Sequence, residues 1–179
     1  DTLIEAPQST LSGAARVLVH AGKINAATAE GLVRTAKEQR TSFVAALMAT
    51  NVLSSADLAH TLSQALALPV MDLGAIKSEL LPKNIVDTKL TNQYQVVVLG
   101  KRGNRVFIGG SDPTNHEAAD RIKFATQLAP EWVIVEHDKL AKLLDLQGTS
   151  ASDALQALSE GDIDFDINDD ISTPEAAAE

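Results

Sequence analysis

Few side chains in this sequence occur in a pattern that could support catalysis. The histidines, His20, His60, His116 and His137, are scattered, with no H-E-x-x-H pair and no carboxylate at metal-ligand spacing. Neither a G-x-S-x-G nucleophile turn nor the G-x-x-x-x-G-K-[ST] phosphate loop needed for ATP hydrolysis is present. The chain has no cysteine, which excludes disulfides, thiolate metal sites and thiol catalysis. We therefore expect no catalytic residues, no metal site and no cofactor in this segment.

One predicted strand-to-helix junction has residues that could bind an anion. Gly109, Gly110, Ser111 and Asp112 lie where a predicted strand meets the N-terminus of a predicted helix, whose free amides attract negative charge. In the alternative interpretation, the glycines relieve crowding and Ser111 or Asp112 caps the helix. We favour this structural interpretation, because the Asp112 carboxylate would itself repel an anion.

Lys101, Arg102 and Arg105 form the one basic cluster in the sequence. They flank Gly103-Asn104, the turn of a predicted β-hairpin. Charged residues at such a tip commonly discourage pairing between sheet edges. In the alternative, functional interpretation, these three residues contact an acidic partner or the chain's own acidic C-terminal part.

The net charge of −9 arises from one end of the chain. Residues 148–179 hold nine of the 24 acidic side chains and none of the 15 basic ones, so residues 1–147 carry 15 of each sign. A neutral body has no excess of cations to bind nucleic acid or an anionic membrane surface. The sequence shows no signal peptide and no membrane span, and its lack of cysteine suits a reducing cytosol. Because it begins with Asp rather than Met, we expect it to be a piece of a longer protein.

Apolar residues recur at helical spacing through residues 10–68. Shifting the sequence by 29 residues places Gly22 on Asn51, Asn25 on Ser54, and apolar positions on apolar positions. Glycine and asparagine both tolerate the left-handed conformation that ends many helices, and Asn25 and Ser54 suit the cap position before a helix. We predict two tandem αα-hairpins stacked as a four-helix unit, because one hairpin cannot bury its own apolar stripe. DNA binding is disfavoured, since the second hairpin has no Lys or Arg.

Residues 69–147 have the pattern of a small α+β sandwich with an aliphatic core. Ala118, Ile122 and Ala125 are expected on the buried face of its second helix. The predicted order is β-α-β-β-α-β-α: a strand at 70–73, a helix at 81–94, a hairpin with strands at 95–100 and 106–110, a helix at 117–128, a strand at 132–135 and a helix that Asp138 caps.

The two ends of the chain lack the pattern of a folded domain. Residues 1–9 show no periodicity and are expected to form a disordered leader. Residues 148–179 are predicted to be a disordered acidic linker, because they contain too little apolar surface to offset the entropy of ordering. One short stretch at 152–159 could be helical.

Four stretches of the sequence resemble one protein family. They are residues 11–19, residues 68–73, the run K-R-G-N-R-V-F-I-G-G-S-D-P-T-N at 101–115, and I-K-F at 122–124. Over residues 11–147 the chain resembles the N-terminal domain, of the MshEN or type II secretion E-like kind, of the PilB family of type IV pilus extension ATPases. The resemblance implies a non-catalytic regulatory and docking domain that contacts pilus assembly-platform proteins or a PilZ-type adaptor. It also implies a homohexameric parent that uses ATP and Mg²⁺ at the cytoplasmic face of the inner membrane, without inserting into it.

Related MshEN domains bind cyclic di-GMP through two tandem copies of a motif with Arg-Leu-Gly, Leu-Val, Gly, Leu and Gln. The positions that retain the motif here are Leu18, Val19, Gly22 and, three residues out of place, Gln39 in the first copy, and Leu47 and Leu58 in the second. The Arg-Leu-Gly triplets fall instead on Gly-Ala-Ala at 13–15 and Ser-Phe-Val at 42–44, so the arginine is missing from both copies. The resemblance therefore leaves a second function open, that of a cyclic di-GMP sensor.

Overall fold

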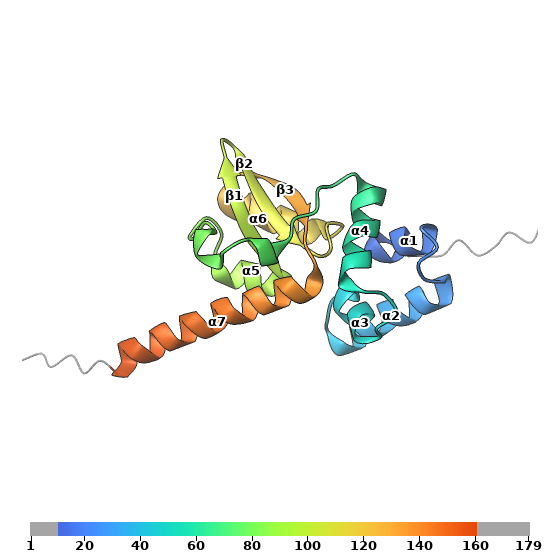
Figure 1. Cartoon of the computed structure of the whole chain (residues 1–179), viewed down its shortest axis with the longest axis horizontal. Helices are drawn as coiled ribbons and strands as arrows, with labels where there is room; N and C mark the ends of the chain where they lie inside the picture. The colour runs from blue at the N-terminus through green and yellow to red at the C-terminus, as the bar shows by residue number, and fades with distance from the viewer. Residues whose placement is uncertain (1–10, 161–179) are drawn as a thin grey trace, which may run out of the picture. The chain divides into compact units, whose positions relative to one another are not determined.

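A computed structural model describes residues 11–160 of the chain, and the predicted leader at 1–9 and the acidic residues 161–179 lie outside this range. The chain divides into two units, residues 1–146 and 147–179. The first unit contains all of the described strands and all of the described helices except the C-terminal part of the last one (Figure 1). No helix in the described part of the chain is long and apolar enough to cross a membrane.

Four helices make up the predicted tandem repeat: α1 (Gly13–His20), α2 (Ala26–Gln39), α3 (Phe43–Ala49) and α4 (Ser55–Leu66). The two linking residues that the repeat aligns, Gly22 and Asn51, both adopt the left-handed conformation, with φ of +70° and +54°. The two aligned caps are also confirmed, because the Asn25 side chain accepts from the Thr28 amide at 2.7 Å and Ser54 Oγ accepts from the Asp57 amide at 3.1 Å. The prediction of two stacked hairpins is therefore correct.

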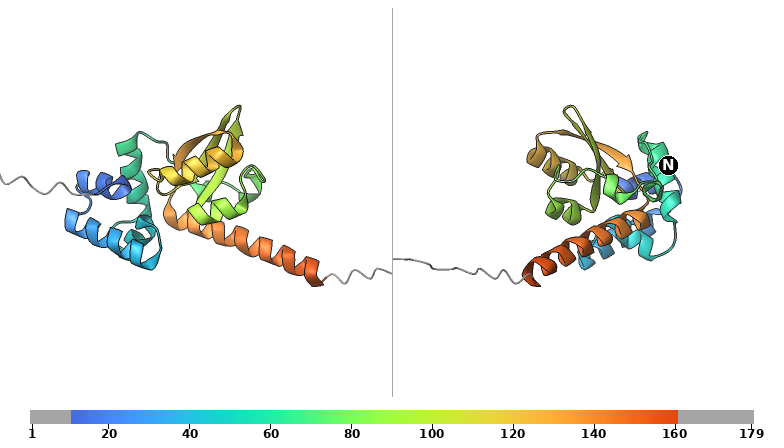
Figure 2. Two further views of the ribbon diagram at one scale, coloured as in Figure 1. Left: turned by 180° about the vertical axis from the view of Figure 1, so that it is seen from behind. Right: turned by 60° about the vertical axis from the view of Figure 1, so that its left-hand side comes forward.

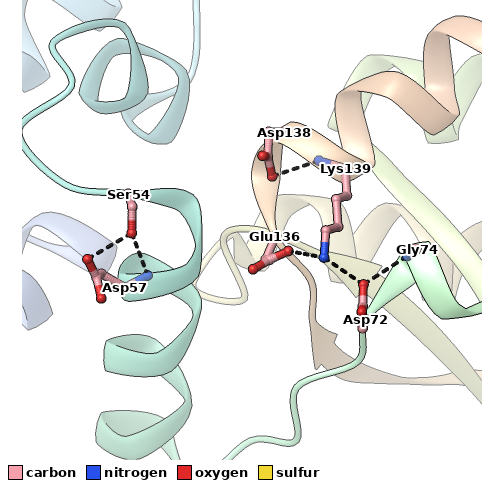
Figure 3. A network of polar contacts seen from close by, with 7 residues as sticks. All are labelled: Ser54, Asp57, Asp72, Gly74, Glu136, Asp138 and Lys139. Carbon is pink, nitrogen blue, oxygen red and sulfur yellow. Dashed lines mark hydrogen bonds and ion pairs between the residues drawn. The ribbon is translucent and has the colours of Figure 1, made fainter.

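The S-S-A-D sequence at 54–57 predicts a reciprocal capping box, and the structure contains half of it. The Ser54 hydroxyl accepts from the Asp57 amide, as the motif requires. The Asp57 carboxylate does not accept the backbone amide of Ser54. It accepts the Ser54 hydroxyl proton instead, at 2.8 Å (Figure 3).

Aliphatic side chains fill the core of the helical repeat, as the low aromatic content predicts. The largest fully buried side chains of the four helices come from both hairpins, and they are Leu18, Val44, Leu47, Leu58 and Leu62. One residue of this core, Ile134, comes from the sheet and is fully buried. The sheet of the α+β part therefore contributes one residue to the core of the helical repeat, while the α+β part also has apolar clusters of its own.

The segment that follows α4 differs from its prediction. Instead of a strand at 70–73, Val70 forms a single parallel bridge to Ile134, and the chain turns into two short 3-10 helices, η1 (Leu73–Ala75) and η2 (Ser78–Leu80). The predicted helix at 81–94 starts only at α5 (Thr88–Tyr94), where Asp87 accepts from the Lys89 amide at 3.0 Å. Asn84 is left-handed, with φ of +64°, and a left-handed residue interrupts a right-handed helix.

Three strands form one sheet in the order β1 (Val96–Arg102), β2 (Arg105–Gly110) and β3 (Ala129–Ile134). The predicted hairpin is confirmed: β1 and β2 are antiparallel and are joined at Gly103-Asn104, with an irregularity between Val98 and Gly100. β3 begins three residues before its predicted start and runs parallel to β2. A parallel pair requires a crossover, and α6 (His116–Thr126) supplies it.

Helices cover both faces of the sheet, which explains three consecutive buried valines in β1. α6 and α7 (His137–Glu160) lie on opposite faces of the sheet (Figure 2). Val96 and Val98 pack with Ile122 of α6 on one face, whereas Val97 packs on the other face with Leu140 and Leu144 of α7. On α6, Ala118 and Ile122 are buried as predicted, but Ala125 is exposed. The predicted sandwich is therefore present, with one helical position assigned to the wrong face.

The last helix is longer than its prediction. The helix begins at His137, so Asp138 lies in its first turn and not at the predicted cap position. α7 continues through Gly148 to Glu160, so the short helical stretch predicted at 152–159 is part of it. Residues 148–160 are therefore helical rather than disordered. The glycine costs only about 1 kcal/mol relative to alanine in a helix, and the Ala and Leu residues that follow it have high helix propensity.

Candidate functional site

The sequence-predicted ligand positions do not form one exposed site. Leu18, Leu47 and Leu58 lie in the core of the helical repeat with at most 1% exposure, and their side chains hold the four helices together. Val19 is partly buried against the same core. Only Gly22, after α1, and Gln39, at the end of α2, are exposed. As a binding site, these six positions remain a prediction.

The predicted partner-binding residues Lys101, Arg102 and Arg105 lie at the exposed tip of the β1–β2 hairpin. Arg105 forms an ion pair with Glu131 of β3, with Nη1 and Oε1 3.1 Å apart. Such an exposed pair contributes at most about 1 kcal/mol to stability. Within the described part of the chain, Lys101 and Arg102 form no ion pair, so two cations at the tip remain available to a partner.

Sequence reasoning missed a cavity of about 400 Å³ between the helical repeat and the α+β part of the first unit. The turn between α2 and α3 and the first turn of α3 contribute one wall. The other walls come from the end of α5, the start of β1, the end of β2, the loop before α6, β3 and the start of α7. Its lining residues are Arg40, Thr41, Ser42, Ala45, Gln93, Tyr94, Gln95, Val96, Gly110, Ser111, Asp112, Asn115, Trp132 and His137. The sequence signal that could have located it is the junction at 109–112, which borders the cavity.

The geometry of that junction supports the structural interpretation of its glycines. A Cβ added at Gly110 would lie 2.6 Å from Cζ3 of Trp132, and one added at Gly109 would lie 2.8 Å from Cγ1 of Val97. Neither Ser111 nor Asp112 caps α6 as expected. The cap is Asn115, whose side chain accepts from the Ala118 amide at 3.2 Å.

Ser111 and Asp112 have other partners. The Asp112 carboxylate accepts from the Thr114 amide at 3.0 Å and from the Thr114 hydroxyl, and so stabilises the loop before α6. Ser111 Oγ is hydrogen-bonded to His137 Nδ1 at 3.0 Å. Partial burial lowers the pKa of His137, and the nearby Asp138 carboxylate opposes this effect. His137 is therefore mainly neutral at pH 7.

The Ser111–His137 pair has the first contact of a nucleophile and its base. A hydrolytic triad also needs a carboxylate that orients the other ring nitrogen of the histidine. No carboxylate of the described residues is hydrogen-bonded to that nitrogen. The pair therefore has the geometry of a structural contact between β2 and α7.

One degenerate motif triplet lies against the loop at 112–114, and the other begins at the cavity that this loop borders. A Cβ added at Gly13, the first residue of one triplet, would lie 2.9 Å from Thr114 Oγ1. Ser42, the first residue of the other triplet, lines the cavity together with Asp112. The two copies of the helical motif and the S-D-P-T-N loop, which are far apart in the sequence, are thus brought to one region of the molecule.

Residues 66–148 match the model of the MshEN domain. This range contains the hairpin-tip residues Lys101, Arg102 and Arg105, and it excludes the six predicted ligand positions, which all lie before residue 66.

Two curated relatives cover most of the chain. The type IV pilus assembly ATPase PilB of Pseudomonas aeruginosa is 35% identical over 170 residues, which is 94% of this chain and 30% of that protein. PilB of Acinetobacter baylyi is 36% identical over 133 residues, which is 74% of this chain and 23% of that protein. The chain thus spans less than a third of the length of these relatives.

Solved structures share the fold. The match to MshE, in a structure with cdg, has a TM-score of 0.55 and 23% identity. It covers 75% of this chain and 98% of the MshE chain. The match to the N-terminal domain of XpsE has a TM-score of 0.58 and 21% identity. It covers 74% of this chain and 91% of the XpsE chain. Residues 66–148 thus match the MshEN domain model, within a chain that is similar in sequence to type IV pilus assembly ATPases.

Proposed function

We propose that this chain is a non-catalytic N-terminal regulatory and docking domain of a PilB-like type IV pilus extension ATPase. The observation that carries this proposal is the 35% identity to a pilus assembly ATPase over 94% of the chain. ATP hydrolysis with Mg²⁺ would belong to another part of the hexameric parent, because this sequence has no phosphate-binding loop. Its partner would be a pilus assembly-platform protein or a PilZ-type adaptor at the cytoplasmic face of the inner membrane.

Two exposed features of the MshEN domain support a docking role. Phe124 on α6 is 80% exposed, and an exposed aromatic side chain is a common anchor in protein interfaces. Lys101 and Arg102 at the hairpin tip add two cations that would favour an acidic partner.

The docking proposal is tested by titrating this chain with the cytoplasmic parts of the assembly-platform proteins and with the PilZ-type adaptor. We expect one of them to bind, and we expect Phe124→Ala or Lys101→Glu with Arg102→Glu to weaken binding at least about 10-fold. Val52→Ala is the matched control, because Val52 is also an exposed apolar side chain (56%) but lies in the helical repeat, outside the matched domain. Absence of binding to all of these proteins would contradict the proposal.

A second candidate function is a cyclic di-GMP sensor that regulates the pilus motor. It is favoured by the fold shared with MshE, whose structure is with cdg. It is also favoured by the position of the first motif triplet beside the loop at 112–114 and of Ser42, in the second triplet, at the cavity that this loop borders. Calorimetry with cyclic di-GMP should then show saturable micromolar binding. If the retained motif positions form the site, Gly22→Arg should abolish that binding. A flat titration at high protein concentration would remove this candidate.

A further inference from the structure

The cavity between the helical repeat and the α+β part contains a cation without a partner. Arg40 follows α2 in the left-handed conformation, with φ of +53°, and is an exposed residue that lines the cavity. Among the described residues, this guanidinium forms no ion pair and no side-chain hydrogen bond. The carboxylate in the same cavity, Asp112, is held by Thr114 and is not ion-paired with Arg40.

The other cavity walls suit a flat, polar ring. Tyr94 and Trp132 supply aromatic surface, and Gln93 and Gln95 supply amide groups that can both donate and accept hydrogen bonds. The volume, about 400 Å³, lies within the usual range for small-molecule sites. An anionic group and a planar ring with donors and acceptors on its edge are together the chemistry of a nucleotide.

The position of Arg40 also bears on the missing arginine of the second motif copy. When the second copy of the cyclic di-GMP motif is matched to this sequence, the position of its arginine falls on Ser42, two residues after Arg40. Ser42 is occupied with capping α3, where its Oγ accepts from the Ala45 amide at 3.1 Å. The left-handed backbone at Arg40 turns the chain between α2 and α3, and both residues line the cavity.

We infer that Arg40 is the anion-binding residue of this cavity, in place of the guanidinium absent at position 42, and that the cavity binds one nucleotide unit between Arg40 and the aromatic wall. This inference rests on the second proposed function and assigns its site to residues other than the retained motif positions. A guanidinium binds phosphate or the acceptor edge of guanine through two parallel hydrogen bonds, which neither serine nor an apolar side chain can replace.

The experiment uses Trp132, the single tryptophan of the chain, as a reporter inside the cavity. The full chain is titrated with cyclic di-GMP, GMP, guanosine and inorganic phosphate, and binding is followed by Trp132 fluorescence and by calorimetry. We expect cyclic di-GMP and GMP to change the fluorescence and to bind more tightly than guanosine or phosphate alone. Arg40→Gln should weaken binding on the order of 10-fold to 100-fold, and Arg40→Lys should weaken it less.

Arg34→Gln is the matched control, because Arg34 is exposed on α2 but does not line the cavity. Its binding should equal that of the unmodified chain, and circular dichroism should show that all variants fold. Equal losses in Arg34→Gln and Arg40→Gln, or none in Arg40→Gln, would overturn the role of Arg40 while leaving the nucleotide function in place. Binding that is lost in Gly22→Arg but kept in Arg40→Gln would also overturn it, since the ligand would then lie at the motif positions. No binding of any probe by the unmodified chain would remove the nucleotide function itself.

Discussion

At the scale of single residues, two glycines at the end of β2 are buried against side chains that leave no room for a Cβ. Gly110 faces the Trp132 ring, and Gly109 faces Val97. Their role can be predicted from the sequence as relief of crowding, but the crowding groups cannot, because Val97 and Trp132 approach only once the sheet has formed. Gly100, in β1, provides a natural contrast, since a Cβ added there would have no neighbouring atom within 4 Å.

Gly110→Ala should lower the free energy of unfolding by about 1–3 kcal/mol, because the Trp132 ring must move to admit the methyl group. Denaturant titration measures the loss, and the near-ultraviolet circular dichroism of Trp132 should change with it. Gly100→Ala is the control and should change stability by less than about 0.5 kcal/mol. A loss equal to that of the control would show that the ring is not a close neighbour.

The lowered pKa of His137 predicts that the stability of the folded chain depends on pH. Burial lowers its pKa below the ordinary value of 6.5, so the unfolded chain binds this proton more readily than the folded chain. Stability therefore decreases as the pH falls below about 6.5. Comparing unfolding at pH 7 and pH 5 should show a smaller decrease for His137→Gln than for the unmodified chain.

At the scale of elements, side-chain caps mark the starts of α2, α3 and α4. Asn25, Ser42 and Ser54 each accept a backbone amide three residues ahead, at 2.7 to 3.1 Å. These starts are predictable because the capping contact is local in the sequence. The predicted helix at 81–94 fails for a reason that is also local: Asn84 takes the left-handed conformation, and Asp87 caps a shorter helix.

Ser54→Ala should lower the free energy of unfolding by about 1 kcal/mol, since it leaves the Asp57 amide without its acceptor. Thermal or denaturant unfolding measures the change. Ser54→Asn keeps an acceptor at the cap and should restore most of the stability. If both substitutions cost the same, the capping contact does not account for the effect.

A charged contact fastens the segment after α4 to the start of α7. Lys139 Nζ lies 2.7 Å from Asp72 Oδ1 and 2.6 Å from Glu136 Oε2, and Asp72 also accepts from the Gly74 amide (Figure 3). The hydrogen bond from Lys139 lowers the pKa of Asp72, and the two carboxylates raise the pKa of Lys139. The stabilisation from Asp72 is therefore present above its ordinary pKa of 3.8 and is lost as the pH falls through the lower folded value.

A double-mutant cycle with Asp72→Asn and Lys139→Met should show coupling at pH 7. The decrease in melting temperature of the double variant should be smaller than the sum of the two single decreases. The coupling should diminish in high salt, since both side chains are partly exposed, and should vanish in strong acid. Asp72→Asn combined with Lys142→Met, a lysine further along α7, should show additive effects.

At the scale of the whole molecule, Ile134 connects the helical repeat to the sheet. It is the last residue of β3, it is fully buried, and it packs in the core of the four helices. Its amide also donates to Pro69 O at 2.8 Å, and its carbonyl accepts from the Met71 amide at 2.9 Å. The two parts that the sequence presents as successive domains are thus joined within the first unit.

Ile134→Ala should destabilise the chain by about 2–5 kcal/mol and should also weaken the cooperativity of unfolding, because it removes the shared core residue. The denaturant transition should broaden or separate into two. Ile122→Ala, at a fully buried position within the α+β core alone, should lower stability similarly but keep one sharp transition. A single sharp transition in Ile134→Ala as well would contradict the coupling.

Sequence alone specifies the features of this chain that depend on near neighbours. Apolar periodicity, the caps and the left-handed residues Gly22 and Asn51 specify the four-helix repeat, and Gly103-Asn104 specifies the hairpin. Tertiary packing determines which residues are available to a ligand or partner. Leu18 and Leu47, which the motif marks as ligand positions, are buried in the core, whereas Arg40 and Trp132 line the same cavity. Periodicity indicates which face of an element is apolar, but the approach of residues distant in the sequence depends on how the elements pack together.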